Sequence, residues 1–249
     1  MVPETVAVIA LLVCLATAVQ GTLGFGFAIV FAPLAALVVN VDTAIATSIV
    51  VGAFASLSQY AQSRPRAGIA TIAPMVLGAL AGLPLGLALL AGTDETTLRL
   101  LVGVGVLVSA LLTLARRSAP RPRTEERLPW MLGAGMISGV TLGAVSMNGP
   151  PVLLYLHWTG GFASEIRARM IAFLAFSSLP GVIIGTAFGL IDSDVVVLVL
   201  AGIPGIAAGL WMGRRLRHRL SEEQFAVASM SVLAIASVVA IGGAVSALL

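Results

Sequence analysis

Residues 5–39 read TVAVIALLVCLATAVQGTLGFGFAIVFAPLAALVV, an apolar run that is interrupted near its middle by three glycines. A helix needs roughly 20 apolar residues to cross the hydrocarbon core of a bilayer, so this run is too long for one simple crossing. Gly21, Gly24 and Gly26 weaken a helix at this point because glycine loses the most backbone freedom on folding. We interpret the run as two short helices that form a hairpin inside a membrane.

The rest of the chain has the same apolar character. Of its 249 residues, 59% are hydrophobic and only 10% are charged, and the mean hydropathy is +1.07. A soluble globular domain carries far more charge. The composition therefore predicts an all-α integral membrane protein that crosses the lipid bilayer several times. The further apolar segments lie at 43–62, 70–91, 97–115, 130–157, 168–190, 195–213 and 224–248.

Two parts of the chain repeat each other. Thr-Leu-Gly at 22–24 recurs at 141–143, and the glycine pattern of 78–86 recurs at 205–213. Internal similarity in the same order favours a structural repeat. We therefore divide the chain into a first transmembrane repeat at 1–117, a linker at 118–129 and a second transmembrane repeat at 130–249.

The charges assign the connecting turns to the two faces of the membrane. Cytoplasmic loops are enriched in arginine, so Arg64, Arg66 and the basic stretches at 116–127 and 214–219 are predicted to lie inside. The turns with Asp42, with Asp94-Glu95 and with Asp192 and Asp194 are predicted to lie outside, as are both termini. Corresponding turns then fall on opposite faces, which predicts two inverted-topology repeats. Inversion requires an odd number of crossings, so each repeat is expected to hold a broken, re-entrant hairpin plus three transmembrane helices.

The first segment of the second repeat also carries helix-breaking residues. Gly139, Gly143, Gly149 and Pro150 interrupt the apolar run at 130–157. Backbone that is not helical is tolerated at membrane depth only where it is buried in protein or lines an aqueous cavity. Two such breaks predict a cavity between the repeats, and secondary transporters bind their substrates at such places.

The residues at the two breaks form a pattern that extends over nearly the whole chain. It consists of Gly-Thr-Leu-Gly-Phe-Gly-Phe at 21–27, Ala-Ile-Ala-Thr-Ser at 44–48, Asn-Gly-Pro-Pro at 148–151 and Arg-Ala-Arg at 167–169. This pattern resembles the sulfite exporter TauE/SafE family. The resemblance implies a transporter that moves sulfite, sulfonates or related small anions across the bacterial inner membrane.

The chemistry of the breaks favours an anion site on independent grounds. A glycine lets the backbone approach a ligand, and the helix that follows presents unpaired N–H groups and a partial positive charge. Close helix packing and hydroxyls that bond back to their own helix are the alternative explanations. The candidate substrate-binding residues are Thr22, Gly24, Phe25, Gly26, Thr47, Ser48, Thr141, Gly143, Ser146, Asn148, Gly149, Arg167 and Arg169.

The two arginines in this set have two interpretations. Arg167 and Arg169 follow the second hairpin directly, and a guanidinium fork suits an oxyanion. The same residues are also typical of a cytoplasmic boundary, where arginine extends its charged end toward water.

Several classes of function are disfavoured. The sequence has no Cys/His metal spacing, no Ser/His/Asp set in the lipid region and no phosphate loop, so we expect neither an enzyme nor a bound cofactor or metal. The net charge of +3 reflects membrane topology, and we expect no nucleic-acid partner. A carrier for a small anion is the favoured function, with an anion channel or a structural membrane partner as alternatives. The glycine-rich later helices are compatible with a homodimer.

Overall fold

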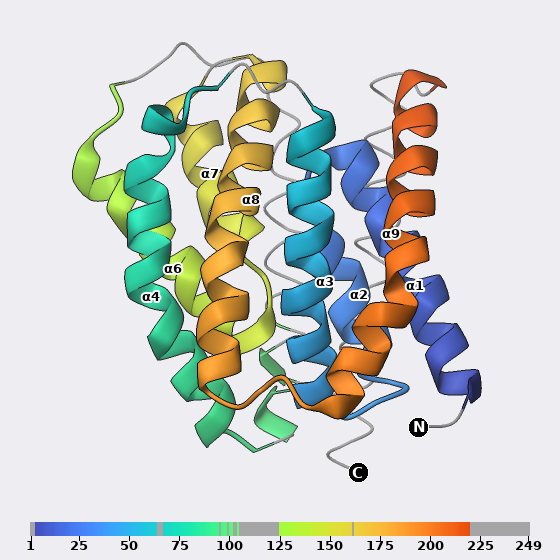
Figure 1. The fold of residues 1–249 in the computed structure, drawn as a ribbon. Coiled ribbons are helices and arrows are strands. Elements are labelled where there is room, and N and C mark those ends of the chain that lie inside the picture. The colour runs from blue at the N-terminus through green and yellow to red at the C-terminus, as the bar shows by residue number, and fades with distance from the viewer. Residues whose placement is uncertain are drawn as a thin grey trace.

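The computed structural model of the chain is an all-helical bundle (Figure 1). The structure describes residues 3–63, 67–94, 96–98, 100–101, 104, 125–160 and 162–219. Within these ranges no residue lies in a strand, and six helices are long and apolar enough to cross a membrane. The prediction of an all-α, multi-pass membrane protein is confirmed.

The helices fall close to the predicted segments. The predicted segments at 97–115 and 224–248, the linker at 118–129, and Arg64 and Arg66 lie wholly or mostly outside the described residues. The elements are α1 (Pro3–Leu23), α2 (Phe27–Ala35), α3 (Val41–Gln62), η1 (Ile69–Thr71), α4 (Ala73–Gly92), α6 (Leu128–Val145), α7 (Gly149–Thr159), α8 (Ala163–Ala187) and α9 (Ser193–Arg219).

Both predicted segments with breaks are split into a long helix and a short one. α1 has 21 residues and α2 has 9, while α6 has 18 and α7 has 11. The first helix of each pair is therefore longer than the predicted short helix. The prediction that Gly139 and Gly143 interrupt the second segment is wrong, because α6 continues through both of them and ends only at Val145.

The two pairs of helices open toward opposite ends of the bundle. In Figure 1, α1 rises from the lower end and α2 returns toward it, whereas α6 descends from the upper end and α7 returns upward. α1 packs along α9, and α4 packs along α6, so each pairing joins the first part of the chain to the second. These pairings are those expected of an inverted repeat. The repeat itself stays a prediction, because the last helix of each predicted half is largely or wholly outside the described residues.

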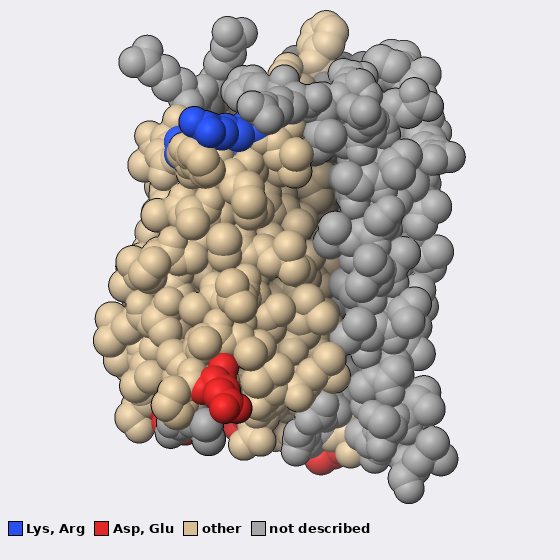
Figure 2. Space-filling model, turned by 90° about the vertical axis from the view of Figure 1, so that its right-hand side faces the viewer, with Lys and Arg blue, Asp and Glu red and all other residues tan. Residues whose placement is uncertain are grey.

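Basic and acidic residues lie at opposite ends of the face shown in Figure 2. α9 extends as a helix through Arg214, Arg215 and Arg217, which the sequence had placed in a loop. Arginine is a good helix former, so the helix continues beyond its apolar part. The guanidinium of Arg215 lies 4.0 Å from the ring centroid of Trp211 and covers its face. Which end faces the cytoplasm stays a prediction.

Two aspartates at the acidic end start helices. Asp192 accepts a 2.8 Å hydrogen bond from the N–H of Val195 at the start of α9. Asp94 accepts hydrogen bonds from the backbone N–H and the hydroxyl of Thr97 (3.0 and 2.8 Å), and these bonds hold the pKa of Asp94 below its ordinary value. Both are N-caps that satisfy donors of the first helical turn.

Glycines at every fourth position allow the long helices to pack with their backbones in contact. On α4, a Cβ added to Gly82 would overlap the carbonyl oxygen of Met136 on α6. On α6, a Cβ added to Gly139 would overlap the carbonyl oxygen of Ala79 on α4. Gly209 of α9 contacts Cys14 and Thr17 of α1 in the same way. Small residues permit this approach in membranes, where lipid offers no hydrophobic driving force between helices.

A glycine-to-alanine pair in α6 tests this packing. We expect Gly139→Ala to destabilise the protein by about 1–3 kcal/mol, because the new methyl group meets the backbone of α4. Gly133→Ala is the matched control, since nothing lies within 4 Å of an added Cβ there and alanine favours a helix by about 0.5–1 kcal/mol over glycine. Thermal unfolding in detergent micelles measures both. Equal melting temperatures for the two variants would contradict the packing described here.

Candidate functional site

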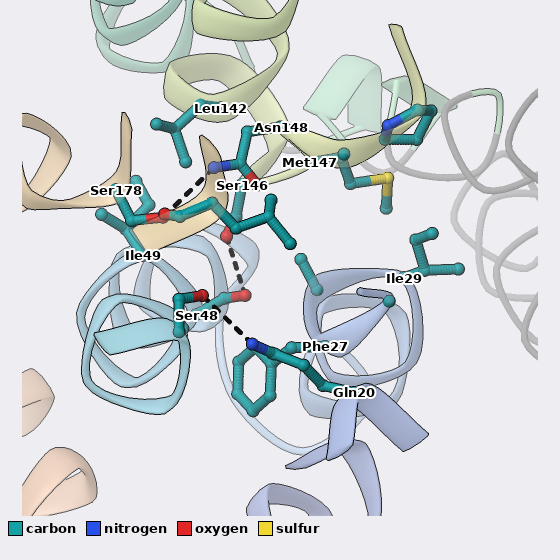
Figure 3. A pocket seen from close by; sticks show the side chains of 17 residues that line it. Gln20, Phe27, Ile29, Ser48, Ile49, Leu142, Ser146, Met147, Asn148 and Ser178 are labelled. Carbon is teal, nitrogen blue, oxygen red and sulfur yellow. Dashed lines mark hydrogen bonds between the residues drawn. The ribbon is translucent and has the colours of Figure 1, made fainter. Parts of the chain in front are cut away.

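The two helix breaks meet at one cavity. A Cβ added to Gly149 at the second break would lie 3.9 Å from the Cβ of Phe25 at the first break. The cavity has a volume of about 30 Å³, which is room for roughly two water molecules. Figure 3 shows several of its side chains. The lining residues are Gln20, Gly26, Phe27, Ala28, Ile29, Ser48, Ile49, Gly52, Ser56, Leu142, Ser146, Met147, Asn148, Gly149, Pro150, Leu174 and Ser178.

Both short helices turn their N-terminal ends toward this cavity. Gly26 precedes α2 with a φ of 103°, a left-handed conformation that favours glycine. The first helical bond of α2 runs from the N–H of Val30 to the carbonyl of Gly26. The N–H groups of Phe27, Ala28 and Ile29 therefore have no carbonyl partner within the helix, and all three residues line the cavity.

The N-terminal end of α7 offers fewer donors than that of α2. Gly149, Pro150 and Pro151 form its first turn, and proline has no N–H. Proline is well suited to the start of a helix because its φ is already helical. Gly149 is thus the single residue of this turn with an N–H, although the helix dipole still directs partial positive charge at the cavity.

A hydrogen bond between hydroxyls joins the two parts of the chain across the cavity. Ser146 lies 2.8 Å from Ser48, oxygen to oxygen (Figure 3). This bond uses one of the two hydroxyl hydrogens, so the other is free to donate to a ligand. Ser146 is also the one non-glycine residue with positive φ (63°) in the described ranges. This left-handed conformation costs about 1 kcal/mol, and such strain tends to occur at functional sites.

Asn148 is held by a network of serines. Its Nδ2 donates to Ser177 and Ser178, both at 3.1 Å, and Ser178 donates to the carbonyl of Leu174 at 2.6 Å. The hydroxyl of Ser138 on α6 bonds the backbone carbonyl of Asn148. The second break is therefore fixed to α6 and α8 from both sides.

Gln20 is a cavity residue that the sequence analysis missed. Its Nε2 donates to Ser56 at 3.1 Å and to the side-chain oxygen of Gln59 at 3.2 Å, and Gln59 donates back to the carbonyl of Gln20 at 3.0 Å. Gln20 is the only amide side chain in the apolar run at 5–39. An isolated amide next to Gly21 in an apolar run could have identified Gln20 as a candidate cavity residue from the sequence.

The spacing along α3 carried a second signal that was not used. Ser48, Gly52 and Ser56 lie four residues apart, so they share one face of the helix, and all three line the cavity. A polar or small residue at every fourth position of an otherwise apolar helix indicates a face turned to a cavity or to a neighbouring helix.

Arg167 contacts the backbone of the first break. Its Nη1 donates to the carbonyl of Thr22 at 2.6 Å and its Nη2 to the carbonyl of Gly21 at 3.0 Å. These carbonyls end α1, where a cation is favoured by the helix dipole. Gly24, with a φ of 89°, makes room for the arginine, since an added Cβ would lie 3.0 Å from its Cγ.

Arg169 lies close by in sequence but contacts other elements. It forms an ion pair with Glu126, with 2.9 Å between Nη2 and Oε2, and it donates to the carbonyl of Thr71 at 2.9 Å. It therefore ties α8 to η1 and to the residues that precede α6. Neither Arg167 nor Arg169 lines the cavity.

The structure brings only some of the predicted site residues to the cavity. Those that line it are Gly26, Ser48, Ser146, Asn148 and Gly149.

The remaining predicted residues serve packing or hold backbone groups. The hydroxyl of Thr22 lies 2.7 Å from the carbonyl of Ala18 and that of Thr141 lies 3.1 Å from Ile137, both one turn earlier on the same helix. Thr47 is buried and its hydroxyl has no partner. Gly143 packs against α4, where an added Cβ would lie 2.5 Å from the backbone nitrogen of Leu87.

These features define a multi-pass membrane protein with a cavity between two helix breaks that polar and apolar residues line together. The model of the family described as "Sulfite exporter TauE/SafE" matches residues 9–240. The chain therefore belongs to the sulfite exporter TauE/SafE family, as the sequence pattern predicted. Membership in this transporter family indicates a membrane exporter of sulfite or related sulfur anions. No curated protein and no solved structure matches the chain.

A double-mutant cycle tests whether Gly24 accommodates Arg167. We expect Gly24→Ala and Arg167→Ala each to lower the melting temperature, and the double variant to lose less than the sum. In the Arg167→Ala background the methyl group added at position 24 no longer meets the arginine side chain. Only the positive φ at position 24 then remains unfavourable for alanine. Groups in direct contact couple by about 0.5–3 kcal/mol. Thermal unfolding in detergent measures this coupling, and strictly additive losses would contradict the contact.

Proposed function

We propose that this protein is a carrier for a compact sulfur oxyanion such as sulfite, and that the anion binds in the cavity between the two helix breaks. The observation that carries the proposal is that the N-terminal turns of α2 and α7 both line this one cavity. The N-terminus of a helix binds anions through free N–H groups and its partial positive charge. Two such ends at one site favour negative charge there.

The side chains of the cavity complement these backbone groups. Ser48 and Ser146 share one hydrogen bond and keep one hydroxyl hydrogen for a ligand. Asn148 and Gly149 lie at the start of α7, beside the dipole end of that helix. None of the described residues that line the cavity carries a charge, so no carboxylate among them opposes an anion. In this proposal Gly26, Ser48, Ser146, Asn148 and Gly149 form the site.

The two arginines have supporting roles in the proposal. The hydrogen bonds of Arg167 and Arg169 go to carbonyls and to Glu126, so these residues hold the frame around the site. Thr22 donates to the carbonyl of Gly213 on α9 at 3.2 Å and Gly143 packs on α4, so both hold helices together. The hydroxyl of Thr141 bonds within its own helix, while Gly24 and Phe25 shape the first break.

The position of the cavity suits alternating access. Ser48 belongs to the first part of the chain and Ser146 to the second. Movement of one part against the other would break this bond and open the cavity to one side, as in transporters built from repeats. A channel would conduct without such exchange, so saturable counterflow separates the proposed carrier from a channel and from a structural membrane protein.

Two neighbouring hydroxyls on α3 provide the test of the site. We expect Ser48→Ala to raise the KM for sulfite counterflow in proteoliposomes roughly tenfold or more, because it removes a hydrogen bond to a charged ligand. Thr47→Val is the control. Its hydroxyl is buried without a partner and lies outside the cavity, so transport should match that of the unmodified protein.

Equal KM values for Ser48→Ala and the unmodified protein would remove the cavity as the substrate site. No counterflow of sulfite, thiosulfate or sulfate in the unmodified protein would remove the proposed function.

Because the described lining residues carry no charge, we expect the membrane potential to drive transport of the anion. An anion that leaves a negative-inside compartment gains roughly 2.3 kcal/mol per charge per 100 mV. We expect efflux of sulfite from proteoliposomes to accelerate when a potassium gradient with valinomycin makes the interior negative. An efflux rate that does not change with the membrane potential but increases with an imposed pH gradient would indicate proton coupling instead.

A further inference from the structure

One aromatic side chain occupies the proposed anion site. Phe27 is the first residue of α2 and lines the cavity with only 4% of its surface exposed. Figure 3 shows its ring beside Gln20. Its backbone N–H belongs to the donors at the start of α2, so the same residue offers a polar group and an apolar wall.

The ring of Phe27 is held in place from two sides. It stacks on Phe31, one turn further along α2, with 5.1 Å between ring centroids and 16° between ring planes. On α3, Gly52 faces the ring, and an added Cβ there would lie 3.3 Å from Cδ1 of Phe27. Such a contact is tight, so any larger residue at position 52 would push the ring toward the cavity or the helices apart.

We propose that Phe27, backed by Gly52, sets the size limit of the substrate site, so that the protein carries inorganic oxyanions such as sulfite and excludes alkanesulfonates. This inference rests on the proposed function. The cavity holds roughly two water molecules, a space that suits a few heavy atoms. An alkanesulfonate presents the same oxygens to the helix ends, but its alkyl chain needs room that the ring of Phe27 fills.

Removal of the ring leaves the anion donors in place. Phe27→Ala keeps the backbone N–H at the start of α2, and the serines and Asn148 are untouched. The variant therefore separates recognition of the oxyanion from exclusion by size. A hydrophobic pocket discriminates against an added methylene by roughly 10- to 200-fold, so the loss of a whole ring is expected to be measurable.

The experiment compares counterflow of labelled sulfite and labelled ethanesulfonate in proteoliposomes. The unmodified protein is expected to exchange sulfite and to exchange ethanesulfonate at least tenfold more slowly. Phe27→Ala is expected to raise the ethanesulfonate-to-sulfite ratio about tenfold or more, with Phe27→Leu in between. Phe173→Leu is the matched control, because this phenylalanine is fully buried on α8 and lies outside the cavity.

A second pair of variants tests the role of Gly52. Gly52→Ala is expected to slow sulfite exchange several-fold by moving the ring, and Phe27→Ala in the same chain is expected to relieve this loss. Two independent losses would remove Gly52 from the proposal.

The outcomes separate the inference from the proposed function. No sulfite exchange by the unmodified protein overturns the proposed function. Sulfite exchange with an unchanged substrate ratio in Phe27→Ala, or a ratio that Phe173→Leu changes equally, overturns the inference alone. Ready exchange of ethanesulfonate by the unmodified protein also overturns it. If Phe27→Ala does not yield a monodisperse protein in detergent, Phe27→Leu and Gly52→Ala still decide the question.

Discussion

The site depends on how two interrupted helices satisfy their backbone polar groups away from water. An unpaired N–H or carbonyl at membrane depth costs several kcal/mol. The carbonyls at the end of α1 are taken by Arg167, and those at the end of α6 by the N–H groups of Ser146 and Met147. The residues at the start of α2, whose N–H groups have no carbonyl partner within the helix, line the cavity. Helix carbonyls with partners and helix N–H groups without them at the two breaks are the basis for proposing an anion rather than a cation at this cavity.

The long helices provide the rigid frame that this arrangement requires. α4 and α6 pack backbone against backbone through glycines on both helices, and the glycines of α9 pack on small residues of α1. Each contact joins an element of the first part of the chain to one of the second. The packed helices therefore join the two breaks in one frame.

The sequence predicted the helices and the first break because their causes are local. An apolar run with Gly24 and Gly26 can be interpreted without knowledge of its neighbours. The prediction that Gly143 interrupts a helix was wrong, since a glycine that permits close packing and a glycine that ends a helix look alike in sequence. Which role applies depends on a partner helix that lies far away in the chain. Gln20 was missed for a related reason, because its partners Ser56 and Gln59 are remote in sequence.

Arg167 and Arg169 show that a positive charge close to a helix break does not by itself identify an anion site. A free guanidinium in a dry cavity would bind an oxyanion strongly, but a carrier must also release its substrate on the other side. The two Nη atoms of Arg167 donate to carbonyls, and those of Arg169 donate to Glu126 and Thr71. The cavity is left with helix dipoles, hydroxyls and two amides, each of which contributes at most a few kcal/mol. In the proposed site an anion would be held weakly enough to leave, which is the balance that transport requires.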